Sequence, residues 1–172
     1  MKTFYSIILI LLISLIYTGC SPKSPKGKEY FNNGDAKLFT QDYAGAIVEY
    51  NKALKINPRY SEAYCNRGAA KFYLQDYPET IADCTKAIEF NPKNGYAYRN
   101  RGSAKYQMQD YRGSIVDCTK ALEIFPNFAE AYFTRGAAKL KVDQKDSGCL
   151  DLSRAGELGY KQAYEVIQKF CQ

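Results

Sequence analysis

Residues 61–94 read SEAYCNRGAAKFYLQDYPETIADCTKAIEFNPKN, and the following residues 95–128 read GYAYRNRGSAKYQMQDYRGSIVDCTKALEIFPNF. The two stretches share one 34-residue register, which continues without gaps into residues 27–60 on one side and 129–162 on the other. Each block carries a Tyr, a Gly and an Ala at the same three places: Tyr30, Gly34 and Ala36; Tyr64, Gly68 and Ala70; Tyr98, Gly102 and Ala104; Tyr132, Gly136 and Ala138. A fixed period of this length predicts stacked units that bury a shared core between neighbours.

Each block is predicted to form two antiparallel helices. In the second block Tyr64, Gly68 and Phe72 lie at i, i+4 and i+8, which is one face of a helix. A second helical run follows the turn signal Gln-Asp-Tyr and ends at Asn91, because a residue that precedes proline is disfavoured in a helix. A glycine inside a helix costs about 1 kcal/mol. Its recurrence at one register therefore indicates that two backbones approach each other closely there.

This pattern resembles the tetratricopeptide repeat, a helix-turn-helix unit of the same period. The resemblance implies an all-α solenoid, whose four helix-turn-helix repeats would be residues 27–60, 61–94, 95–128 and 129–162. The fourth block is atypical, because Leu158-Gly159-Tyr160 stands where the earlier blocks have their closing proline. Residues 163–172 are expected to form an amphipathic C-terminal capping helix that covers the open end of the solenoid.

Charged residues recur at two further registers of the repeat. An arginine stands at one register and an aspartate at the other, whereas block one carries Asn33 and Glu49 at these places. The candidate structural ion pairs are Arg67 with Asp83, Arg101 with Asp117, and Arg135 with Asp151. Because the two partners appear and disappear together, we interpret them as a ladder of ion pairs between helices; the alternative is that both are independently solvated. A third recurring cation is explained by a solvated outer row: Lys37, Lys71, Lys105 and Lys139.

Two cysteines are predicted to lie in the core. Cys84 and Cys118 share the register that holds Tyr50 in block one and Leu152 in block four, so these thiols are expected to fill apolar space. Copies of one register in adjacent repeats lie about 10 Å apart, which is too far for a disulfide. Cys65 is expected to point toward the inner surface and to be free.

Two other cysteines form a candidate disulfide. Cys149 precedes the turn at Gly159 by about as many residues as Cys171 follows it, so an antiparallel helix pair would bring them opposite each other. We hypothesise a bond between them that staples the cap and contributes roughly 3 kcal/mol.

The first residues resemble a bacterial lipoprotein signal. Lys2 precedes a largely apolar run at residues 4–17, which is short for a bilayer span of about 20 residues. The run leads into Thr-Gly-Cys20, which is similar to a lipobox, although Tyr17 stands where that motif prefers Leu. The resemblance implies that residues 1–19 are a signal peptide and that Cys20 is lipidated. An uncleaved anchor and an ordinary secreted form are the alternatives.

Residues 20–26 are predicted to form a flexible, extended tether, because they contain two prolines and no apolar side chain after Cys20. Ser21 follows the cysteine, where lipoproteins retained in the inner membrane carry Asp. The resemblance therefore implies the bacterial cell envelope, with the protein on the outer membrane facing the periplasm. The lysines of the tether would either attract an anionic lipid surface or keep the segment solvated.

In tetratricopeptide repeat proteins the first helix of each repeat lines a concave groove that takes an extended peptide or a helix. The positions that correspond to it here are aromatic with few charges. The candidate partner-binding residues are Phe31, Asn32, Asp35, Phe39, Asn66, Phe72, Tyr73, Arg99, Asn100, Tyr106 and Phe133. Asn32, Asn66 and Asn100 share one register, where their amides either hold a peptide backbone or hydrogen-bond across helices.

Some members of this family bind a C-terminal carboxylate through a clamp of Lys, Asn and Arg. In this chain Phe31, Asp35, Tyr96 and Asn100 stand at clamp positions, so the clamp is absent. An apolar or aromatic segment is therefore the expected ligand.

The leading hypothesis is a membrane-tethered adaptor that holds a protein or peptide of unknown identity in the groove. The alternative is a structural envelope protein that self-associates. Catalysis is not expected, because the chain has no histidine to act as an acid-base partner for Cys or Ser and no Gly-rich phosphate loop. No cofactor or metal is expected either. The formal charge of +6 is interspersed with acidic residues and lacks the basic run typical of nucleic-acid binding.

Overall fold

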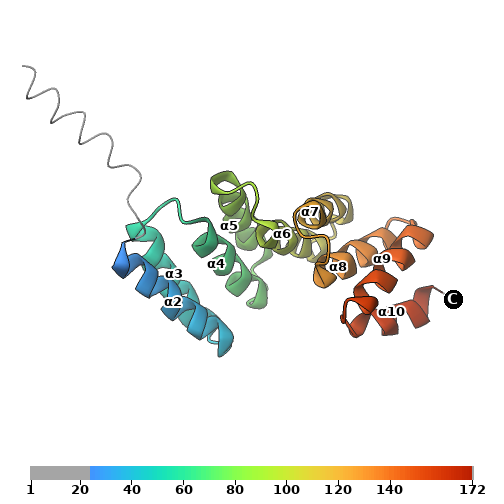
Figure 1. Ribbon diagram of the computed structural model, residues 1–172, viewed down its shortest axis with the longest axis horizontal. Coiled ribbons are helices and arrows are strands. Elements are labelled where there is room, and N and C mark those ends of the chain that lie inside the picture. The colour runs from blue at the N-terminus through green and yellow to red at the C-terminus, as the bar shows by residue number, and fades with distance from the viewer. Residues whose placement is uncertain (1–23, 172) are drawn as a thin grey trace, which may run out of the picture.

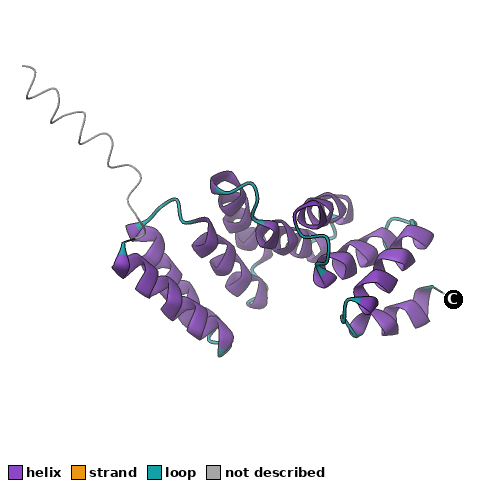
Figure 2. Cartoon of the chain, in the orientation of Figure 1, coloured by secondary structure: helices purple, strands orange, loops and turns teal. Residues whose placement is uncertain are grey.

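The computed structural model describes residues 24–171 and arranges them as an elongated array of helices (Figure 1). The helices are α2 (Pro25–Phe39), α3 (Tyr43–Ile56), α4 (Ser61–Tyr73), α5 (Tyr77–Phe90), α6 (Gly95–Gln107), α7 (Tyr111–Ile124), α8 (Ala129–Leu140), α9 (Lys145–Glu157) and α10 (Gln162–Phe170). This described range contains no β-strand (Figure 2). The predicted all-α solenoid of paired helices is confirmed.

The first helices of the repeats form one continuous layer. Each helix packs on its neighbours in sequence, and α2, α4, α6 and α8 also contact one another in succession. The second helices α3, α5, α7 and α9 lie between them in chain order. The first helices are therefore the elements whose side chains can act together on one surface.

The turn inside each of the first three repeats depends on the Gln-Asp pair that precedes the second helix. Gln41, Gln75 and Gln109 have φ angles between 62° and 65°, in the left-handed region that few side chains adopt. Asp42, which follows in the first repeat, accepts a hydrogen bond from the backbone N–H of Gly45, and the corresponding aspartates cap α5 and α7. The capping satisfies a backbone donor that the helix leaves unpaired.

The recurring glycines admit a side chain from the second helix of the same repeat. A Cβ at Gly34 would lie 2.5 Å from the Tyr50 ring, and one at Gly102 would lie 2.8 Å from the Cys118 thiol. At Gly136 the neighbour is backbone, a carbonyl oxygen of α9 at 2.8 Å. The prediction that two backbones approach closely at this register is right in the fourth repeat. In the second and third repeats a Cβ would also lie 3.4 and 3.3 Å from a carbonyl oxygen of the facing helix, whereas in the first repeat the three nearest atoms all belong to the Tyr50 ring.

Two registers of the second helices supply buried core residues along the whole solenoid. One register is fully buried in every repeat and holds Tyr50, Cys84, Cys118 and Leu152. The other holds a small side chain throughout: Ala53, Ala87, Ala121 and Ala155. The expected core position of the two cysteines is confirmed, and the small second register lets consecutive repeats approach closely.

The N-terminal boundary differs from the prediction. Pro25 and Lys26, expected in the extended tether, form the first turn of α2. Proline is tolerated there because its missing N–H needs no partner in the first turn of a helix. Cys20 and the expected signal peptide lie outside the described residues. None of the helices within residues 24–171 combines the length and apolarity needed to cross a membrane.

The C-terminal helix α10 closes the other end of the solenoid. It begins at Gln162 and packs on α9, where Ala163 is fully buried beside Leu152 and Ala155. Val166 also packs against this cluster. The helix thus covers the last apolar face of the stack, as an end repeat must.

Candidate functional site

Two adjoining clefts lie along the layer of first helices. The C-terminal cleft has a volume of about 660 Å³ and is bounded by α4, α6, α8 and α10. The N-terminal cleft has a volume of about 620 Å³ and is bounded by α2, α4 and α6. Both are lined by Phe72, Tyr73, Arg99 and Ser103. The two clefts therefore meet above α4 and α6 and form one groove, which we call the concave groove.

Most of the predicted partner-binding residues line this groove. The N-terminal cleft holds Asp35, Phe39, Asn66 and Asn100, the C-terminal cleft holds Tyr106 and Phe133, and both are lined by Phe72, Tyr73 and Arg99. Phe39 and Tyr73 are the most exposed of the aromatic residues, at 90% and 58%. Helical spacing was sufficient to bring these residues together, because each stands on the same face of a first helix.

Two predicted groove residues lie outside both clefts. The Phe31 ring stacks on the Tyr60 ring at 4.8 Å between centroids and tilts against the Tyr50 ring at 5.9 Å. Its assignment to the groove is therefore wrong, because it packs within the first repeat, against Tyr50 of α3 and Tyr60 just before α4. Asn32 is exposed and lines neither cleft.

The other two asparagines of this register bond across helices. Asn66 Nδ2 donates to Asp35 Oδ1 at 2.8 Å, which links α4 to α2. Asn100 Nδ2 donates to the Cys65 carbonyl oxygen at 3.5 Å, which links α6 to α4. These two amides therefore form bridges between helices, which is one of the two roles predicted for them.

Asp35 is held from two directions. The Tyr50 hydroxyl donates to the same Oδ1 at 2.7 Å. Burial raises the pKa of the Tyr50 hydroxyl, and its bond to Asp35 raises it further. The carboxylate is therefore already engaged at the floor of the N-terminal cleft and is a fixed part of its wall.

The C-terminal cleft has a further apolar wall, whose residues are not among the predicted partner-binding residues. Tyr160, Val166 and Phe170 line it from the turn after α9 and from α10. The Tyr160 ring lies 4.7 Å from the Phe133 ring. The apolar face of the predicted capping helix is the sequence feature that indicates these residues, although by itself it predicts only a cover for the end of the solenoid. In the structure this helix both covers the end and closes the groove.

The ion-pair ladder lies on a different part of each repeat. Each arginine donates to both carboxylate oxygens of one aspartate at 2.6 to 2.9 Å: Arg67 to Asp83, Arg101 to Asp117, and Arg135 to Asp151. Each guanidinium also donates to the preceding repeat, at Asn51, Thr85 and Thr119 respectively. All the predicted pairs are thus formed, and each ties two repeats together.

The recurring lysines belong to the same network. Lys71, Lys105 and Lys139 lie 2.8 to 3.0 Å from the aspartate of their own repeat. The prediction of a solvated outer row is wrong for these three, because each aspartate is almost fully buried and binds two cations. Lys37, in the repeat that has no such aspartate, pairs with Asp42 at the surface.

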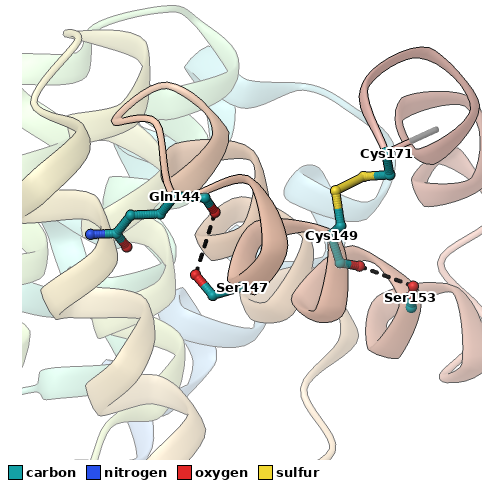
Figure 3. The surroundings of a disulfide bond; sticks show 5 residues. All are labelled: Gln144, Ser147, Cys149, Ser153 and Cys171. Atoms are coloured by element: carbon teal, nitrogen blue, oxygen red, sulfur yellow. Dashed lines mark hydrogen bonds between the residues drawn. A yellow bond between two sulfur atoms is a disulfide. The ribbon is translucent and has the colours of Figure 1, made fainter.

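The predicted cysteine pair is bonded in the structure. Cys149 on α9 and Cys171 at the end of α10 form a disulfide with their Cα atoms 5.7 Å apart (Figure 3). The bond holds the end of α10 against α9. It therefore fixes the helix that forms the end wall of the concave groove.

The remaining cysteines of the described range are free and buried: Cys65, Cys84 and Cys118. Burial raises the pKa of the Cys65 and Cys118 thiols to about 12. These thiols are protonated at neutral pH and are not nucleophiles. Within residues 24–171 no cluster of His, Cys, Asp or Glu could hold a metal ion.

Two family models match the sequence. The tetratricopeptide repeat model matches residues 61–94, and a TPR repeat model matches residues 34–75. No curated protein sequence matches the chain significantly.

Solved structures share the fold. The TPR domain of Arabidopsis OM64 is 27% identical with a TM-score of 0.67, and the match covers 70% of this chain and 99% of that one. The first TPR domain of Spaghetti (RPAP3), bound to the HSP90 peptide SRMEEVD, is 26% identical with a TM-score of 0.69, covering 73% and 99%. MamA, at 22% identity and a TM-score of 0.70, covers 86% and 85% and shows the common fold alone. Residues 34–94 thus match tetratricopeptide repeat models, and the paired helices of the described residues form the same solenoid fold as these TPR domains.

Proposed function

We propose that this protein is a membrane-tethered adaptor that holds a segment of a partner protein in its concave groove. The observation that carries the proposal is the pair of adjoining clefts, into which α2, α4, α6, α8 and α10 each contribute aromatic side chains. The similar domain of Spaghetti binds a peptide, which supports the same kind of ligand here. Exposed aromatic side chains such as Phe39 and Tyr73 give a binding surface large contact area with little loss of side-chain entropy.

A photo-crosslinking experiment in the native host tests the groove. The photoreactive residue p-benzoylphenylalanine replaces Phe39, which lies in the N-terminal cleft, or Tyr73, where the clefts meet. Val116 on α7 is the matched control, because it is 61% exposed and lines neither cleft. We expect the same crosslinked partner from both groove positions and none from Val116. Crosslinks from Val116 alone would move the binding site to the outer helices.

The same crosslinks distinguish an adaptor from a self-associating protein. An adaptor yields adducts with a different polypeptide, and it sediments as a monomer across a concentration series. A structural protein that assembles with itself yields adducts of twice its own mass and sediments faster as its concentration rises. The second result would replace the adaptor proposal.

The tether rests on the sequence around Cys20. We propose that Cys20 carries the lipid and that the protein is anchored in the outer membrane, facing the periplasm. Metabolic labelling with an alkyne fatty acid should label the wild type and not Cys20→Ser. The variant should also leave the membrane fraction; its retention there would indicate an uncleaved anchor, and a soluble wild type would indicate an ordinary secreted protein.

A further inference from the structure

Arg99 places a guanidinium in the concave groove, at the point where the two clefts meet. Its Nε atom is buried and has no hydrogen-bond partner among the described residues. The guanidinium lies over the Phe128 ring at 5.4 Å from the centroid. This contact orients the cation from the residue that precedes α8, and no ion pair within residues 24–171 includes Arg99.

The acidic residues of the groove do not satisfy Arg99. Asp35 already accepts hydrogen bonds from Tyr50 and Asn66. Glu130 lines the C-terminal cleft but is exposed and makes no ion pair with Arg99. By contrast, Arg67 of the ladder binds both oxygens of an aspartate. A buried guanidinium donor without an acceptor is costly, and a carboxylate is the group whose shape matches it.

The residues around Arg99 indicate which other group the ligand carries beside that carboxylate. From Arg99 the C-terminal cleft extends to Phe133, Tyr160 and the α10 residues Val166 and Phe170. These side chains present apolar surface at the end of the cleft. A ligand that reaches from the guanidinium to this end wall buries a bulky apolar side chain there.

We propose that Arg99 binds the side-chain carboxylate of an Asp or Glu in the partner segment, and that a bulky apolar residue of the same segment occupies the pocket formed with α10. This inference rests on the proposed function of the groove and specifies its ligand. The carboxylate belongs to a side chain and not to a chain end, because Arg99 lines both clefts. A segment that ended at Arg99 would leave one of the two clefts empty.

Selection from two peptide libraries tests the inference on the full-length protein in detergent. In one library random peptides are joined to carrier sequence at both ends, and in the other they have free C-termini. The wild type should enrich internal Asp or Glu beside Leu, Ile, Phe or Trp in both libraries. Arg99→Gln should keep the apolar preference and lose the acidic one, and Arg99→Glu should select Lys or Arg at that position. Arg112→Gln is the control, since Arg112 is exposed on α7 and lines neither cleft.

Fluorescence anisotropy with one selected peptide gives the magnitude. We expect at least about a tenfold loss of affinity when the peptide's acid becomes its amide, or when Arg99 becomes Gln, and little further loss when both are changed. Arg99→Lys should restore part of the affinity, and the helical circular dichroism of each variant shows that it is folded.

The outcomes separate the two proposals. Apolar peptides selected with no acidic position would overturn the role of Arg99 and leave the groove as the binding site. Enrichment only at free C-termini would overturn the choice of a side-chain carboxylate. Failure to select any peptide, or equal selection by groove variants such as Phe72→Ala, would overturn the groove itself.

Discussion

The first and third repeats fill the same space with different side chains. In the first, Gly34 accepts the Tyr50 ring, whose hydroxyl donates to Asp35 on the groove side. In the third, Gly102 accepts the much smaller Cys118 thiol. This register therefore accepts either an aromatic ring or a thiol against the glycine, and both side chains are fully buried.

The two repeats also differ in how they hold charge. The third repeat buries Asp117 between Arg101 and Lys105. At the same register the first repeat has Glu49, which pairs with the exposed Lys52. The buried aspartates of the ladder thus belong to the later repeats, and the ladder reaches the first repeat only through the bond of Arg67 to Asn51. The following predictions test this contrast.

The largest expected effect comes from removing the buried aspartate of the third repeat. Asp117→Ala leaves two cations without their partner and should lower the free energy of unfolding by about 3–5 kcal/mol. Glu49→Ala, at the same register of the first repeat, should cost about 1 kcal/mol or less, because its partner is exposed. Urea unfolding followed by circular dichroism measures both. Equal losses would mean that the two repeats do not differ in this respect.

Next in size is the disulfide, which closes only the C-terminal end of the described solenoid. Replacing Cys149 and Cys171 by Ser should lower the stability by roughly 3 kcal/mol. Hydrogen exchange should accelerate in α10 and leave α2 in the first repeat unchanged. Dithiothreitol should reproduce the effect in the wild type and add nothing to the variant. Unchanged exchange in α10 would show that packing alone holds the cap.

A smaller effect is expected from the Tyr50 hydroxyl. Tyr50→Phe keeps the ring beside Gly34 and removes the hydrogen bond to Asp35, so it should cost about 1 kcal/mol. Tyr98→Phe in the third repeat is the control, since the Tyr98 ring contacts Arg101 through its face. Thermal unfolding should place Tyr50→Phe below the control. Identical melting temperatures would show that the Tyr50 hydroxyl does not stabilise the first repeat.

The smallest effect is the response of the third repeat to alkaline pH. Burial raises the pKa of Cys118 to about 12, so the folded protein retains a proton that the unfolded chain releases from about pH 9 upward. Stability from this thiol is complete below that range and falls as the pH rises toward 12. At pH 9.5 the loss should be below about 1 kcal/mol. Urea unfolding at pH 7 and 9.5 should show a smaller difference for Cys118→Ala than for the wild type; equal differences would contradict the assignment.

Local pattern was enough to predict most of the fold. The spacing of Tyr64, Gly68 and Phe72 defines a helix face without knowledge of its neighbours, and a register that repeats every 34 residues carries that face through the whole stack. The pairing of Arg101 with Asp117 was predictable for the same reason, because both registers lie on facing helices of one repeat. The bonded Cys149 and Cys171 flank a single turn.

Prediction was poorer where the conformation of a long side chain decides its contact. The repeat pattern predicts a solvated Lys105, but this lysine shares Asp117 with Arg101. The helical position of Phe31 predicts a place in the groove, but its ring stacks on Tyr60 at the end of the same repeat. In both cases the helix face was correct, and the length and rotamer of the side chain decided the contact.

By itself the sequence determined the repeat, the helices, the faces they bury and the residues available to the groove, because these follow from periodicity along one chain. Only the tertiary structure decided that two clefts meet at Arg99, that the buried Nε of this residue has no partner within the described range, and that α10 supplies the apolar end wall. Those features depend on the rotation between successive repeats and on the return of the last helix across the groove. Both are set by the packing of side chains from different repeats, and no local spacing encodes them.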